Sequence, residues 1–179
     1  DEPVLPGQVA APRQSIPPGQ IDAWLAIAPD GGVTLYTGKV ELGTGVATAL
    51  AQIVAEELDV AVARITVVQG DTARTPDQGV TAGSKTIQRG AVVIRQAAAD
   101  ARYTLRLLAS VRLSTSVDQL ATANGVVSVI DDPTRRATYG ELVGGRRFSR
   151  PVTRDFQTKP RAAYTVVGTS APRLDIPAK

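Results

Sequence analysis

A strand pattern, a glycine-bearing turn, a helix pattern and a second strand pattern follow one another between residues 33 and 68. Val33–Thr37 alternates as a half-buried strand does. After the turn at residues 38–45, apolar residues recur at helical spacing over Val46–Leu58, and Ile65–Val68 is a further apolar run. This order predicts an α/β-type unit.

Two further segments flank this unit. Ala23–Ile27 is predicted to form a hairpin with the first strand, because residues 29–32, Pro-Asp-Gly-Gly, are a turn signal. Residues 70–83 form a turn-rich loop, which we expect to be functional because long structureless loops are uncommon in compact domains. Ser84 is then predicted to begin a second, long helix. Its alanine-rich apolar stripe consists of Ile87, Ala91, Ile94, Ala98, Ala101, Leu105 and Leu108.

The rest of the chain completes the predicted fold class. A short helical turn is expected at Asp118–Ala123 and a strand at Gly125–Ile130. Together the patterns predict an α/β (α+β) fold, with a short mixed sheet and two main helices.

Proline distribution predicts how the chain is organised. Five of the twelve prolines lie within the first 18 residues, so residues 1–20 are expected to form an extended arm. Residues 21–149 are the patterned domain segment, and residues 150–179 are expected to be an extended connector to the rest of an assembly. The chain contains no Met, so we expect a processed product or a piece of a longer protein.

Missing residue types exclude several kinds of chemistry. The 179 residues include no Cys and no His, which excludes zinc sites, haem attachment, iron–sulfur clusters and His-dependent nucleophiles in this chain. The net charge is +3, from 20 basic and 17 acidic residues, and aromatic residues make up 4%. Neither property favours a nucleic-acid partner. No apolar run approaches the roughly 20 residues of a membrane span.

Two turns could bind an anion. Residues 43–45, Gly-Thr-Gly, run into the first helix, and residues 81–86, Thr-Ala-Gly-Ser-Lys-Thr, run into the second. A helix N-terminus presents free N–H groups and the positive end of the helix dipole, which favour phosphate. A structural interpretation stays open for each: a plain strand-to-helix turn for the first, and Ser84 as an ordinary N-cap for the second. If one elongated ligand binds both turns, they must lie close together.

Paired charges along the chain are more simply explained as solvated surface. This applies to Glu56–Glu57, Asp131–Asp132, Arg135–Arg136 and Arg146–Arg147. Glu41, beside the first glycine turn, is interpreted as structural. We therefore assign no catalytic residue and no metal ligand in this chain.

Six segments, in a fixed order, carry a family resemblance. They are Gly38–Gly45, Ala49–Leu58, Gly70–Thr72, Thr81–Ser84, Thr138–Leu142 and Pro172–Lys179. This series resembles the molybdenum-binding large subunit of the xanthine dehydrogenase/aldehyde oxidase family. The likeness is strongest to the branch with isoquinoline 1-oxidoreductase and the cytochrome-linked nicotinate dehydrogenase, and it leaves out only the arm.

The resemblance implies a cofactor: molybdopterin cytosine dinucleotide with molybdenum, shared with the rest of the catalytic subunit. In that family the two turns contact the pterin and its diphosphate. Carried onto this chain, the cofactor-binding residues would be Gly43, Thr44, Gly45, Thr81, Gly83, Ser84, Lys85 and Thr86. The family usually has Gln at the position of Thr44, and the shorter Thr cannot donate an amide to the pterin.

The resemblance also implies a reaction, the oxidation of an aldehyde or an N-heteroaromatic compound with water supplying the oxygen. The family's catalytic glutamate lies in a C-terminal segment that has no counterpart among these residues. We therefore expect the chain to be the cofactor-holding part of the catalytic subunit of a multi-chain oxidoreductase, and to be inactive alone. The alternative is a non-catalytic interaction or assembly module derived from that domain. A reading frame that continues past Lys179 would favour the enzyme.

The implied partners are the remainder of the large subunit, a [2Fe-2S] small subunit and, as is frequent in this branch, a cytochrome c. This chain itself would carry neither an iron–sulfur cluster nor a haem. Members of the branch often have a twin-arginine export signal. The expected location is therefore the periplasm or the periplasmic face of the inner membrane, with the cytoplasm left open.

Overall fold

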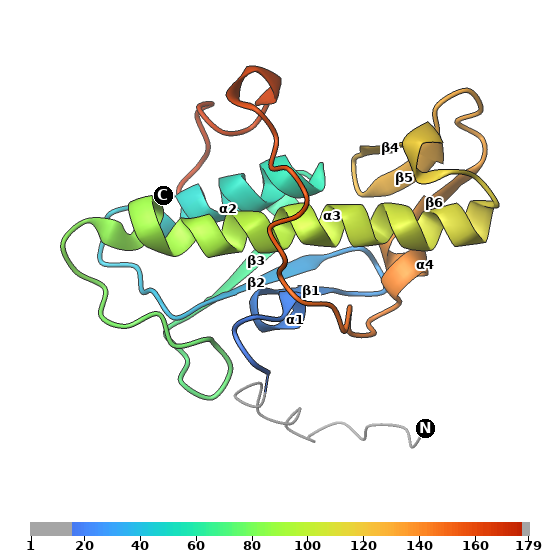
Figure 1. Ribbon diagram of the computed structural model, residues 1–179. Helices are drawn as coiled ribbons and strands as arrows, with labels where there is room; N and C mark the ends of the chain where they lie inside the picture. Colours follow the sequence, from blue (N-terminus) through green and yellow to red (C-terminus); the bar gives the residue numbers. More distant parts are fainter. Residues whose placement is uncertain (1–15, 177–179) are drawn as a thin grey trace.

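Two long helices packed side by side form the centre of the fold (Figure 1). The computed structural model describes residues 16–176. Its elements are α1 (Ile21–Trp24), β1 (Leu25–Ile27), β2 (Val33–Thr37), α2 (Val46–Leu58), β3 (Ile65–Gln69), α3 (Ala91–Leu113), β4 (Leu120–Ala123), β5 (Val126–Val129), β6 (Arg136–Thr138) and α4 (Tyr139–Val143), with single turns of 3-10 helix at Val62–Arg64, Val117–Gln119 and Arg161–Ala163.

The first sheet has the order β1-β2-β3 and is mixed. β1 pairs antiparallel with β2 as the predicted hairpin, and β2 pairs parallel with β3 in the register Val33 to Ile65. Because α2 connects two parallel strands, the predicted α/β-type unit is confirmed. Residues 23 and 24, expected in the first strand, instead belong to α1.

A second, antiparallel sheet has the order β4-β5-β6. The helical turn expected at Asp118–Ala123 is wrong for its last four residues, because Leu120–Ala123 pairs with β5 and only Val117–Gln119 is helical. Neither β6 nor α4 was predicted. α4 begins with a capping box between Thr138 and Glu141, a signal that is visible in the sequence.

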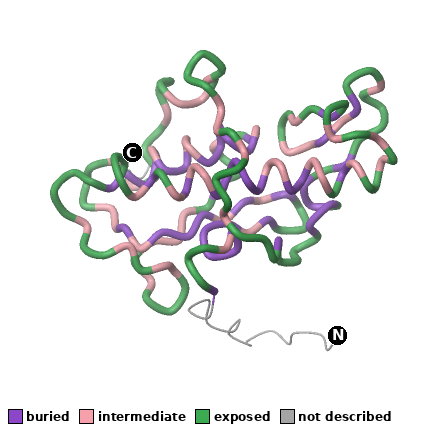
Figure 2. The backbone as a smooth tube through the Cα atoms, in the orientation of Figure 1, coloured by how far each residue is buried: buried purple, intermediate pink, exposed green. Residues whose placement is uncertain are grey.

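α3 follows the predicted apolar stripe but does not begin at Ser84. A single π-helical turn, Thr86–Gly90, precedes it. The central stripe residues have almost no exposure, whereas Ile87 and Leu108 at its two ends are 42% and 40% exposed. In Figure 2 buried backbone follows the inner faces of α2, α3 and the first sheet, and exposed backbone follows the loops. None of the described helices combines the length and apolarity of a membrane crossing.

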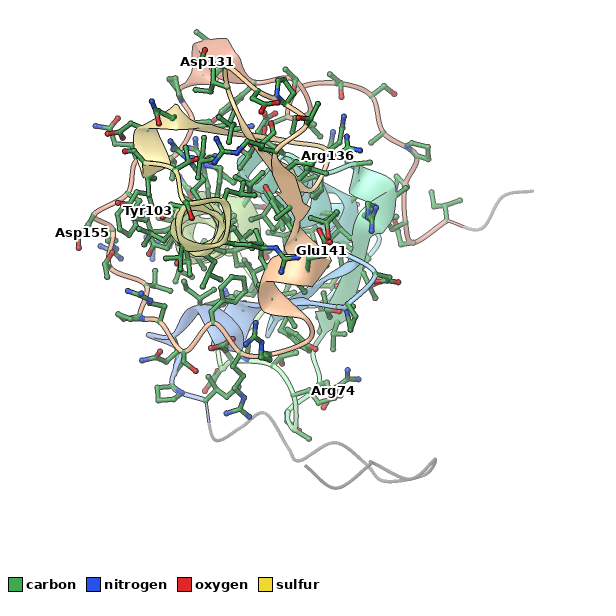
Figure 3. The ribbon with its side chains drawn as sticks, turned by 90° about the vertical axis from the view of Figure 1, so that its right-hand side faces the viewer. Arg74, Tyr103, Asp131, Arg136, Glu141 and Asp155 are labelled. Atoms are coloured by element: carbon green, nitrogen blue, oxygen red, sulfur yellow. The ribbon has the colours of Figure 1, made fainter. Side chains whose placement is uncertain are left out.

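Residues 148–176, which we call the strap, cross α3 and turn back over α2 (Figure 1). Apart from an isolated bridge at Pro151 and one 3-10 turn, this segment has no regular structure. Tyr103 of α3 stacks on Phe156 of the strap, with ring centroids 3.7 Å apart, and it lies on the side of α3 that faces Asp155 (Figure 3).

Buried carboxylates of the helices accept the backbone hydrogen bonds of the strap. Glu56 accepts N–H groups of Thr165, Val166 and Val167 at 2.7–3.0 Å, and Glu57 accepts that of Lys159 at 3.0 Å. The expectation that Glu56 and Glu57 are solvated is therefore wrong, and the two residues are 2% and 0% exposed. Arg95 and Arg102 neutralise Glu57 at 2.9 and 3.0 Å.

The predicted arm lies mostly outside the described residues. Its last part, residues 16–20, has no helix or strand and packs on this chain. Ile16 is buried, Gln20 forms a β-bridge with Pro151, and the Trp24 indole donates to the carbonyl of Pro18 at 2.7 Å.

Candidate functional site

Both glycine turns line a single pocket of about 410 Å³. Small-molecule sites in proteins usually enclose roughly 300–1,000 Å³. Six of the eight residues proposed from the sequence line this pocket: Thr44, Gly45, Thr81, Gly83, Ser84 and Thr86. The two turns thus lie close enough together to contact one shared ligand.

The first turn already holds an anion of its own, the carboxylate of Glu41. Gly45, the N-cap of α2, has a left-handed conformation with φ +77°. Glu41 Oε1 accepts the N–H of Gly45 at 2.8 Å, and Glu41 Oε2 accepts that of Ala47 at 3.0 Å. The expectation of an open helix N-terminus at this turn is therefore wrong, whereas the geometry agrees with the structural role expected for Glu41.

Hydrogen bonds keep Glu41 ionised. Desolvation alone would raise the pKa of this carboxyl group, but hydrogen bonds from Ala47, Gly45 and Thr44 outweigh it and hold the pKa below its ordinary value. The positive N-terminal end of the α2 dipole is thus already paired with the negative charge of Glu41.

The second turn has the backbone geometry of an anion-binding concavity. Gly83 and Ser84 are both left-handed, with φ values of +63° and +55°, and Lys85 returns to the right-handed region with φ −95°. Such an alternation directs successive N–H groups into one concavity. Ser84 is not an ordinary N-cap, because no side-chain cap bond forms here and a π-helical turn follows. Single π turns occur frequently at functional sites.

The end of β2 and the residues that follow it, 37–40, hold the second turn against the first. Gln78 Oε1 accepts from the Thr37 hydroxyl at 2.6 Å and from the Gly38 N–H at 3.0 Å, and the Thr81 hydroxyl accepts the Val40 N–H at 3.1 Å. At Gly38 a Cβ atom would lie 2.3 Å from the carbonyl oxygen of Pro76. This close backbone approach requires glycine.

A buried lysine that was not predicted completes this attachment. Lys39 is only 8% exposed. Its Nζ donates to the carbonyls of Gln78, Gly79 and Val80 at 2.6, 3.3 and 2.7 Å. All three ammonium protons therefore have acceptors. Since the acceptors are backbone carbonyls about forty residues away, no sequence signal identifies this role.

Two of the proposed residues lie outside the pocket lining. Lys85 lines a neighbouring pocket together with Lys39 and Arg89, so it does not contribute a charge to the lining of the first pocket. Ala82 borders both pockets. Gly43 is exposed, and its carbonyl accepts a hydrogen bond from Arg173 at 2.8 Å.

Hydroxyl groups and apolar side chains together line the pocket. The hydroxyl groups belong to Thr44, Thr81, Ser84 and Thr86, and the apolar lining includes Leu42, Val46, Ala49 and Ile87. None of the lining residues is charged, and no cluster of three potential metal ligands occurs among the described residues. This arrangement can bind a ligand that has both polar and apolar groups, but the pocket itself offers no acid or base.

Comparisons with known proteins give a consistent result. Residues 5–173 match a family model described as a molybdopterin cofactor-binding domain. The chain is 41% identical to one of the subunits of nicotinate dehydrogenase of Pseudomonas putida, over 89% of this chain and 13% of that protein. It is 33% identical to the beta chain of isoquinoline 1-oxidoreductase of Brevundimonas diminuta, over 99% of this chain and 28% of that protein.

The fold is similar to a solved enzyme structure. Quinoline 2-oxidoreductase from Pseudomonas putida 86 superposes with a TM-score of 0.58 and 30% sequence identity, over 67% of this chain and 15% of that chain. The 179 residues thus span between 13% and 28% of the length of the two curated relatives.

Proposed function

Because the chain belongs to the molybdopterin cofactor-binding domain family, we propose that the pocket between its two glycine turns binds part of a molybdenum cofactor. The observation that carries this proposal is the convergence of both turns on one pocket. The chain would be the cofactor-holding segment of the catalytic subunit of a multi-chain molybdenum hydroxylase. The names of the relatives support an N-heteroaromatic substrate, and an aldehyde is the second class expected from the sequence.

The residues present fit a pterin-type cofactor. Its flat ring system suits the apolar lining, which includes Val46, Ala49 and Ile87, and its polar edge suits the neighbouring hydroxyl groups. When bound, the cofactor supplies the redox chemistry that a chain without Cys or His lacks. The chain's own residues bind and orient: Thr44, Thr81 and Ser84 offer hydrogen-bonding hydroxyls.

For the cytosine dinucleotide form of the cofactor, we propose that the diphosphate is bound at the second turn. Glu41 already accepts the N–H groups of Gly45 and Ala47 at the start of α2, and an ionised carboxylate repels phosphate. The concavity formed by Ser84 and Lys85 is positively polarised instead. This division of roles follows from the charge of Glu41 and from the backbone geometry of the second turn.

We propose as partners the remainder of the large subunit, a [2Fe-2S] subunit and a cytochrome c. The names of both relatives describe subunits, and the absence of Cys requires that any cluster be bound elsewhere. The proposed location, the periplasm or the periplasmic face of the inner membrane, rests on the family resemblance.

Substitutions at Ser84 test the cofactor assignment. In the assembled enzyme, Ser84→Ala should lower the molybdenum content measured by elemental analysis, because the hydroxyl is lost, with a change in thermal unfolding of only a few degrees. Ser84→Gly should lower it as well while stabilising the left-handed turn. The matched control is Ser149→Ala, another exposed left-handed serine, with φ +51°. Unchanged molybdenum content in both Ser84 variants would contradict the assignment and favour an assembly module.

A further inference from the structure

We propose that Arg173 is a positioning residue, which fixes the first glycine turn from outside the pocket. The inference deepens the proposed function, because it rests on this turn being part of a cofactor site. Arg173 lies 130 residues after the turn in the sequence, near the end of the strap, and it does not line the pocket itself.

The guanidinium group of Arg173 bridges the turn and the strap. Its Nη2 donates to the carbonyl oxygen of Gly43 at 2.8 Å, and its Nε donates to Asp175 Oδ1 at 3.0 Å. Nη2 also pairs with Asp175 Oδ2. The next strap residue is attached as well, because the Leu174 N–H donates to the Thr48 hydroxyl in the first turn of α2 at 2.8 Å.

The side chain of Arg173 also packs on the backbone of the turn. A Cβ atom at Gly45 would lie 3.3 Å from Arg173 Nε and 3.6 Å from its Cζ. The glycine at this position therefore leaves room for the guanidinium group. A larger residue at position 45 would have to displace it.

A turn with two left-handed glycines needs such external contacts. Gly43 and Gly45 have φ values of +83° and +77°, and glycine loses more conformational freedom on ordering than any other residue. Glu41 binds N–H groups of the turn and of α2, and Arg173 binds the carbonyl of Gly43. The two charged side chains thus bind backbone N–H and C=O groups of the turn. In a flexible glycine segment these backbone groups would be solvated instead.

The geometry is specific to arginine. A planar guanidinium group can donate to Asp175 and to the Gly43 carbonyl at once, whereas a lysine ammonium group is a single point on a flexible chain. The hydrogen bond from Arg173 holds the pKa of Asp175 below its ordinary value. The pair therefore stays charged at neutral pH.

The experiment uses the assembled enzyme with full-length chains and compares Arg173→Ala, Arg173→Lys and Asp175→Asn with the parent. Arg136→Ala is the control, since Arg136 is an exposed arginine of β6 that does not line the pocket. Amide hydrogen exchange of residues 43–49 is measured in cofactor-free enzyme, together with molybdenum content and thermal unfolding. In Arg173→Ala we expect exchange of these amides to rise about fivefold, the factor for one ordinary hydrogen bond, and molybdenum content to fall. Arg173→Lys should restore part of both, Asp175→Asn should lie between the parent and Arg173→Ala, and the control should change neither.

The outcomes separate this inference from the proposed function. Unchanged exchange and molybdenum content in Arg173→Ala would overturn the positioning role. Faster exchange throughout the domain, together with a lower melting temperature, would overturn it as well, because it would indicate a general structural role. If the parent enzyme contained no molybdenum but exchange at residues 43–49 still rose only in the Arg173 and Asp175 variants, the proposed function would fail while the positioning of the turn by Arg173 would stand.

Discussion

Four buried carboxylates, each at most 4% exposed, bind backbone N–H groups of the strap. They are Asp22, Glu56, Glu57 and Asp100. A buried charge is unfavourable unless hydrogen bonds or counterions compensate it, and a strap without a neighbouring strand needs acceptors for its own N–H groups. The carboxylates therefore supply the acceptors that the strap needs, and the strap supplies the donors that the buried carboxylates need. We expect the strap and the helices to unfold together.

Sequence periodicity could not predict this burial. A glutamate in a helix is usually exposed, and the N–H donors of Glu56 lie 109 to 111 residues further along the chain. The same applies to Lys39, whose acceptors are main-chain carbonyls. Main-chain groups have no residue-specific signature, so the sequence contains no pattern that pairs them with a particular side chain.

Glu56→Gln should destabilise the 179-residue chain and reduce the pH dependence of its stability. Desolvation alone would raise the pKa of Glu56, but hydrogen bonds from Val167, Val166 and Thr165 and the charge of Lys159 lower it below 4.5. A lowered folded-state pKa contributes stability above pH 4.5 that is lost as the pH falls through the folded-state pKa. Urea unfolding at several pH values between 3 and 7 measures both effects.

At neutral pH we expect Glu56→Gln to lower the free energy of unfolding by about 1.5–3 kcal/mol, the range for a hydrogen bond to a charged group. The variant should also lose less stability than the parent between pH 4.5 and pH 3. Asp131→Asn is the control, because Asp131 is an exposed carboxylate. If the parent and Glu56→Gln lost equal amounts of unfolding free energy between pH 4.5 and pH 3, Glu56 would not be the residue that controls stability in acid.

At the scale of elements, the two long helices and the strands β1, β2, β3 and β5 were predictable, whereas β4, β6 and α4 were not. α2 and most of α3 follow their apolar periodicity, because each buries one face in the core. β4 and β6 have only four and three residues, too few for alternation to distinguish a strand from a turn. The start of α3 was misplaced because Ser84 resembles an N-cap in sequence, whereas its left-handed backbone belongs to the preceding turn.

Lys39→Met should loosen the loop that carries the second turn. Methionine keeps the aliphatic volume but leaves the carbonyls of Gln78 and Val80 without their donor, and such losses destabilise by roughly 1–3 kcal/mol. Amide exchange of residues 78–86 should therefore accelerate more than that of α2. Lys85→Met, a neighbouring exposed lysine, is the control. Equal exchange in the two variants would argue against Lys39 as the residue that holds this loop.

At the scale of the whole molecule, the pocket is bordered by exposed apolar side chains. Leu42 and Ile87 in its lining are 65% and 42% exposed, and Val80, which lines the neighbouring pocket, is 77% exposed. Large apolar groups gathered at a pocket indicate a surface that binds a ligand or another part of a protein. The remainder of the large subunit, which we propose as a partner, is a candidate to cover these side chains.

The isolated 179-residue chain should therefore show no turnover of nicotinate or of an aldehyde. None of the residues lining its pocket is charged, so the pocket contains no group to accept or deliver a proton. Without Cys or His, the chain has no ligands for a cluster or haem that could carry electrons away. Substrate oxidation should be followed with an artificial electron acceptor, with the assembled enzyme as the positive control. Turnover by the isolated chain would contradict the view that it holds only one part of the catalytic centre.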